Sequence, residues 1–60
     1  MSRRRLDVAL VESGLIPTRA RARDAVVRGT VTVDGRVETR PAAAVAADAR
    51  LAVDDPASRW

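Results

Sequence analysis

The stretch from Thr18 to Gly35, TRARARDAVVRGTVTVDG, constrains the fold more than any other part of the chain. Its first residue is a favoured N-cap, and the following residues predict a helix over 19–28 that Gly29 ends. The β-branched run 30–33 predicts a strand, and Asp34-Gly35 is typical of a tight hairpin turn. The fold must therefore hold a short helix that leads directly into a β-hairpin.

This helix is predicted to have a small apolar side and two basic flanks. The stripe expected to be buried consists of Ala22, Ala25 and Val26. The flanks carry four arginines: Arg19 and Arg23 on one, Arg21 and Arg28 on the other. Asp24 lies three residues from Arg21 and four from Arg28, so it can pair with either. We therefore expect Arg19 and Arg23 to be freer to bind phosphate.

A first helix is predicted over Leu6–Ser13, and Gly14 is a plausible stop. One face of this helix carries Leu6, Ala9, Leu10 and Ser13. Asp7 falls in the first turn, where a carboxylate suits the helix dipole. Val8 and Val11 are expected to be partly exposed, either without a role or as a docking face. In the connection to the second helix, Leu15 and Ile16 are expected to fill the core.

The hairpin allows two registers. A two-residue turn places Val33 opposite Arg36, whereas a glycine bulge places Val31 opposite Val37. We favour the bulge because it buries two valines together. The alanine-rich stretch 41–48 is interpreted as an extended connection with Val45 in the core, with a helix as the alternative. A last strand is predicted over 50–53, with Leu51 and Val53 on one face.

The size and composition favour a binding module. A 60-residue chain buries only about 60% of the surface that its unfolded form exposes, which rarely leaves a deep pocket. The absence of Cys and His excludes disulfides, the usual zinc sites and Ser-His or Cys-His catalysis. We expect a monomer that is not an enzyme and has no metal or cofactor. The cysteine-free composition is typical of a cytoplasmic protein, and no apolar run is long enough to span a membrane.

The excess of positive charge is concentrated in the first two thirds of the sequence. Residues 1–40 carry nine arginines against five acids, and residues 41–60 carry two against three. The arm 1–5 contains three consecutive arginines, which either bind phosphate or belong to a frayed terminus. Arginine forks match phosphate geometry, and the chain has no Asn or Gln for reading adenine. With one aromatic residue for base stacking, the chain is best suited to structured RNA.

The order of motifs resembles the S-four RNA-binding domain, a family named for a small-subunit ribosomal protein. The resemblance covers residues 4–53 and rests on RLD at 5–7, GL at 14–15, TRARA at 18–22, GTVTVDG at 29–35 and Asp48 leading to Leu51. It implies an α+β fold, with two short helices packed on a small antiparallel sheet. RNA would lie along the second helix and the hairpin.

The resemblance and the charge pattern together predict one set of RNA-binding residues: Arg4, Arg5, Thr18, Arg19, Arg23, Arg28, Arg36 and Arg40. Three positions depart from the family pattern. Asp34 replaces the commoner Asn, Ala25 replaces a usual Leu, and Ala47 replaces the Gly before Asp48. The first substitution adds a negative charge near the expected RNA surface.

The amino-terminal position of the domain, together with the tail Asp-Pro-Ala-Ser-Arg-Trp at 55–60, resembles the hemolysin-A-type ribosomal RNA 2′-O-methyltransferase family. In that interpretation residues 1–53 bind RNA, and residues 54–60 are a linker to an absent catalytic domain that uses S-adenosylmethionine. The implied partner is ribosomal RNA or a ribosomal subunit, with contacts to the catalytic domain itself. A protein-interaction or membrane-active module is the alternative, although the short, acidic first helix is a poor membrane binder.

Overall fold

The computed structural model describes residues 3–54 and has two helices and five short strands in that range. Their order is β1 (Arg3–Arg5), α1 (Leu6–Glu12), α2 (Arg19–Val27), β2 (Val31–Val33), β3 (Arg36–Val37), β4 (Ala44–Ala46) and β5 (Leu51–Val53). The expected α+β class is confirmed. The start of the basic arm, the linker after Asp54 and Trp60 lie outside the described residues.

Both helices begin and end within one residue of their predicted bounds. Thr18 has an extended backbone, and its hydroxyl oxygen accepts a hydrogen bond from the Arg21 amide at 3.2 Å, as expected of an N-cap. The two helices pack against each other through the buried residues Leu6, Leu10, Ala22 and Val26. Ala25 and Ala9 are only half-buried, and Ser13 is exposed, so both apolar stripes are narrower than predicted.

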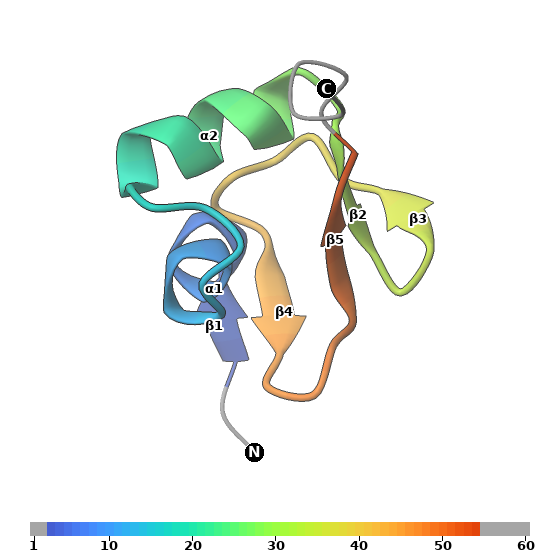
Figure 1. Ribbon diagram of the computed structural model, residues 1–60. Helices are drawn as coiled ribbons and strands as arrows, with labels where there is room; N and C mark the ends of the chain where they lie inside the picture. Colours follow the sequence, from blue (N-terminus) through green and yellow to red (C-terminus); the bar gives the residue numbers. More distant parts are fainter. Residues whose placement is uncertain (1–2, 55–60) are drawn as a thin grey trace.

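The strands form two antiparallel sheets (Figure 1). One pairs β1 with β4, so that Arg3, Arg4 and Arg5 lie opposite Ala46, Val45 and Ala44. The other has the order β3-β2-β5. The predicted extended character of residues 41–48 is confirmed, the helical alternative is wrong, and Val45 is buried in the core. The predicted single sheet is in fact two, because the basic arm supplies a strand of its own.

The favoured hairpin register is wrong. Val33 pairs with Arg36 and Thr32 with Val37, which is the register of the two-residue turn. Asp34 and Gly35 both have positive φ, of 52° and 84°, as a type I′ turn requires. Val31 does not need Val37 as an apolar partner, because it lies opposite Val53 on β5. Val37 is consequently 62% exposed.

The core lies between the helices and the inner faces of the sheets. Its buried apolar residues are Leu6, Leu10, Ile16, Ala22, Val26, Val31 and Val45. Ile16 enters this core as predicted, but Leu15 does not, since it is 47% exposed beside α1. Val8 and Val11 are both partly exposed, as predicted, and Val11 also packs on the core.

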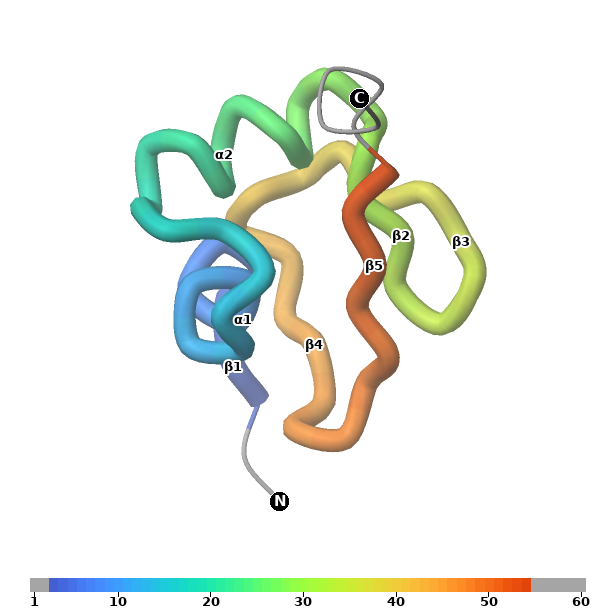
Figure 2. The backbone as a smooth tube through the Cα atoms, viewed as in Figure 1, coloured from blue at the N-terminus to red at the C-terminus, as the bar shows by residue number. Residues whose placement is uncertain are grey.

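The connection between β3 and β4 ties these layers together. It runs past α2 to the start of α1 (Figure 2). A Cβ atom on Gly29 would lie 4.0 Å from the Thr39 methyl group, and the Pro41 carbonyl accepts a hydrogen bond from the Asp7 amide at 3.1 Å. The Leu6 amide similarly bonds to the Ala43 carbonyl at 2.9 Å. These two bonds fix the beginning of α1 to the connection.

Candidate nucleic-acid interface

The predicted site residues on α2 are oriented by the two residues that this helix buries. Ala22 and Val26 face the core, so Arg19 and Arg23 project from one flank, and Arg21 and Arg28 from the other. Thr18 fixes where the helix begins and therefore places Arg19 in its first turn. All four arginines are exposed.

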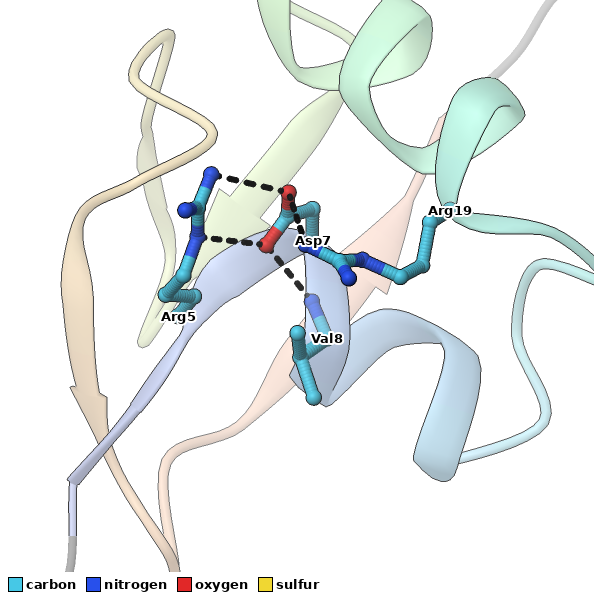
Figure 3. Close-up of polar contacts among 4 residues, drawn as sticks. All are labelled: Arg5, Asp7, Val8 and Arg19. Atoms are coloured by element: carbon cyan, nitrogen blue, oxygen red, sulfur yellow. Dashed lines mark hydrogen bonds and ion pairs between the residues drawn. The ribbon is translucent and has the colours of Figure 1, made fainter.

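Asp7 lies fully buried at the corner where β1, α1 and α2 meet (Figure 3). Its carboxylate accepts hydrogen bonds from the Val8 amide at 2.8 Å and from Arg5 Nε and Nη2 at 3.3 Å each. Arg19 Nη2 lies 3.8 Å from the same Oδ2 atom that Arg5 Nη2 contacts. Two predicted site residues from different elements thus converge on one buried acid.

The burial of Asp7 was not predicted from the sequence. A carboxylate in the first turn is ordinarily explained by the helix dipole, which does not require burial. The signal that could have identified it is its spacing of three residues from Leu10, which places it beside the apolar stripe. The surplus of arginines is the second signal, because a buried carboxylate needs a cationic partner.

Arg40 joins this corner through the backbone. It immediately precedes Pro41, whose carbonyl bonds to the Asp7 amide. Glu38 Oε1 accepts from the Thr39 and Arg40 amides at 3.0 Å each, which fixes the conformation of this turn. The Arg40 side chain is exposed, and it forms no ion pair within residues 3–54. The backbone of Arg40 therefore lies next to the start of α1, where Arg5 and Arg19 contact Asp7.

The predicted shielding by Asp24 is correct for one arginine only. Asp24 Oδ2 lies 3.0 Å from Arg28 Nε, whereas Arg21 has no ion pair among the described residues. Arg19 is not one of the freer arginines, because it shares Asp7 with Arg5. Arg23, one turn further along the same flank, has no ion pair in the described part of the chain.

The remaining predicted residues lie apart from the Asp7 corner. Arg4 projects to the opposite side of β1 from Arg5, where it pairs with Glu12 and lines a shallow hollow with Ala9 and Leu15. Arg28 is at the other end of α2, about 13 Å along the helix axis from Arg19. The structure therefore divides the predicted set between two faces.

Arg36 lies at the hairpin turn, at the end of β2 that is remote from α2 (Figure 1). Asp34 connects this turn to the loop before β5. Its amide donates to the Arg50 carbonyl at 2.8 Å, and its Oδ1 atom accepts from the Arg50 amide at 2.9 Å. Arg50, which was not predicted as a site residue, is thus held beside the turn. This contact also explains Asp34, which the sequence alone left without a role beyond the turn.

Among residues 3–54 no helix is long and apolar enough to cross a membrane. The same residues contain no group of three or more acidic side chains that could hold a metal ion. The features that stand out are exposed arginines, two of which, Arg5 and Arg19, contact the buried Asp7.

The sequence profile of the S4 (S-four) domain matches residues 4–51, which is most of the chain. The chain belongs to the S4 domain family. S4 domains are RNA-binding modules without catalytic activity of their own, and the two helices and small antiparallel sheets agree with this family's fold. No curated protein matches the chain closely enough to suggest a particular role.

Proposed function

We propose that this S4 domain binds structured ribosomal RNA through phosphate contacts from the arginines around α2 and the hairpin. The observation that carries the proposal is the pair of Arg5 and Arg19 on the buried Asp7, with Arg40 in the connection that bonds to the start of α1. All three are exposed, and each belongs to a backbone segment fixed by hydrogen bonds to its neighbours. Fixed cations of this kind suit the regularly spaced phosphates of a folded RNA.

The binding energy would come from release of counterions by the arginines, with shape providing selectivity. The chain has no Asn or Gln for bidentate contacts to adenine, and no Phe or Tyr on which unpaired bases can stack. We therefore expect preference for folded RNA over both single-stranded RNA and duplex DNA.

Titration of a folded ribosomal RNA fragment at several salt concentrations tests this proposal. With about four to six phosphates neutralised, the log–log slope of the association constant should be about −3 to −5. Single-stranded RNA and duplex DNA of equal length, used as competitors at equal salt, should compete more weakly. A flat salt response, or equal competition by duplex DNA, would refute the proposal.

We further propose that the domain serves an S-adenosylmethionine-dependent ribosomal RNA 2′-O-methyltransferase. The support is the resemblance of the motif order and the tail to the hemolysin-A-type family. Tethering would raise the local concentration of RNA for the enzyme. Reading the coding sequence beyond Trp60 tests this proposal separately. A glycine-rich cofactor-binding pattern is expected there, and a stop codon or an unrelated domain would contradict it.

A further inference from the structure

Asp7 is a buried charge in a small apolar core, and its partners are unusual. A buried carboxylate is costly unless it is paired and hydrogen-bonded. Asp7 meets this requirement with one backbone amide and two guanidinium groups that are themselves mostly in solvent. The side chains of Arg5 and Arg19 are 52% and 60% exposed, whereas that of Asp7 is 0% exposed. The acid is thus hidden beneath two accessible cations.

The two guanidinium groups approach the carboxylate from different elements, Arg5 from β1 and Arg19 from α2 (Figure 3). Their Nη2 atoms lie 3.3 and 3.8 Å from the same oxygen, so their separation cannot exceed the sum of these distances. A phosphate group accepting a charge-assisted bond of about 2.8 Å from each side can bridge such a gap.

Both guanidinium groups keep donors for such a phosphate. An arginine has five N–H donors, of which Arg5 directs one from Nε and one from Nη2 at Asp7. Arg19 makes an ion pair at 3.8 Å that is too long to count as a hydrogen bond. Most of the N–H groups of the pair are therefore available to a ligand on the solvent side.

Asp7 also explains why two like charges stay together. Two guanidinium groups this close repel each other, and a single negative charge between them offsets that repulsion. The trio has a net charge of +1, so it still attracts an anion. Arg23 provides the contrast, because it lies one turn from Arg19 on the same flank without an ion pair among residues 3–54.

We propose that Arg5 and Arg19 form a preorganised subsite for one phosphate group of the RNA, and that Asp7 is the residue that positions them. This inference rests on the proposed RNA-binding function and adds a location and a mechanism to it. Arg5 and Arg19 touch the phosphate, whereas Asp7 acts only through them. Arg23 contributes its charge without a fixed geometry.

For Asp7→Asn, the positioning role predicts a change in RNA affinity opposite in sign to the change that net charge alone predicts. Asp7→Asn removes one negative charge, which by long-range attraction should tighten binding to a polyanion. If Asp7 positions the pair, the same substitution should weaken binding about 5- to 10-fold, because an amide cannot offset the repulsion between the arginines. The matched control is Asp24→Asn, which removes an exposed acid from α2 and should tighten binding about 2-fold.

Lysine variants provide a second comparison that does not depend on Asp7→Asn folding. Lysine keeps the charge but lacks the planar fork. Arg5→Lys and Arg19→Lys should each weaken RNA binding about 5-fold with an unchanged salt slope, and Arg23→Lys should weaken it by no more than about 2-fold. The thermal unfolding midpoint of each variant shows that binding is measured on folded protein.

The experiment is titration of one folded ribosomal RNA fragment with the full 60-residue chain and these variants, at three salt concentrations. The expected result is the wild-type salt slope for every lysine variant, with the largest losses of RNA affinity in Arg5→Lys and Arg19→Lys. Equal losses at Arg19 and Arg23, or tighter binding by a folded Asp7→Asn variant, would overturn the inference while leaving RNA binding intact. Absence of salt-dependent binding by the wild-type chain would instead refute the proposed function.

Discussion

The Asp7 corner and the Asp34 turn are both organised around an aspartate, but the two acids have different partners. Asp7 is buried and contacts two arginine side chains and one amide. Asp34 is exposed, and among residues 3–54 its carboxylate accepts a hydrogen bond only from the Arg50 backbone amide. The negative charge of Asp7 therefore pairs with two cations. At position 34, an uncharged side-chain carbonyl could accept the same hydrogen bond.

An acidic residue on a basic surface can therefore have either of two roles, one that needs its charge and one that does not. At the corner, removing the charge should disturb the arrangement of the surrounding cations. At the turn, removing it should leave the structure intact and reduce repulsion of a phosphate backbone.

Truncation of the two aspartates should have unequal effects on stability. Asp7→Ala should lower the free energy of unfolding by about 3–4 kcal/mol, because it leaves the part-buried Val8 amide unpaired and removes the anion between two arginines. Asp34→Ala should cost about 1–2 kcal/mol, mainly because alanine disfavours a φ of 52°. Urea denaturation followed by circular dichroism measures both values. Equal losses would show that the Asp7 contacts contribute no more than a turn residue does.

The effect of removing a single arginine on RNA binding should depend on which face of the domain carries that arginine. Arg36→Ala should weaken binding to folded RNA and reduce the magnitude of the log–log salt slope by about 1, as expected for the loss of one phosphate contact. Arg4→Ala should leave the slope unchanged, because Arg4 projects to the other side of β1 and pairs with Glu12. An equal change in both slopes would mean that the two faces do not differ in RNA contact.

The smallest effect on stability is expected for Asp34→Asn. Asparagine tolerates positive φ, and its side-chain carbonyl can accept the Arg50 amide hydrogen bond. The free energy of unfolding should change by less than about 0.5 kcal/mol. Hydrogen exchange of the Arg50 amide gives a local check, since its protection should persist. Loss of that protection would show that the carboxylate charge itself is needed at the turn.

Local signals predicted the helices well. Thr18 caps α2 as its residue type indicates, and the small residues Ala22 and Val26 face the core. The position of the hairpin followed from Asp34-Gly35. These features depend on residues within a few positions of one another, which is why the sequence pattern was sufficient.

Contacts between distant segments were harder to predict. The hairpin register was misjudged because Val31 pairs with Val53, a residue 22 positions further along the chain. The arginines of β1 have no strand signal of their own, and they become a strand by pairing with the alanine-rich β4. Leu15 and Ile16 were both expected in the core on hydrophobicity alone, but only Ile16 is buried.

The candidate site was predicted as a set of residues but not as an arrangement. Arg5 and Arg19 were both identified, yet the buried acid that joins them was not. Arg4 was predicted to bind RNA together with Arg5, but strand alternation directs it to the other face, where it pairs with Glu12. Residue type therefore identified the charges, whereas their grouping depends on tertiary contacts.

The most direct test compares Asp7→Asn with Asp34→Asn for binding to the same folded RNA at the same salt concentration. Both substitutions remove one negative charge and change few atoms. We predict that Asp34→Asn tightens binding about 2-fold by reducing repulsion of the RNA phosphates. Asp7→Asn should weaken it because Arg5 and Arg19 lose their common anchor. Tighter binding in both variants would contradict the account, because net charge alone would then explain the surface.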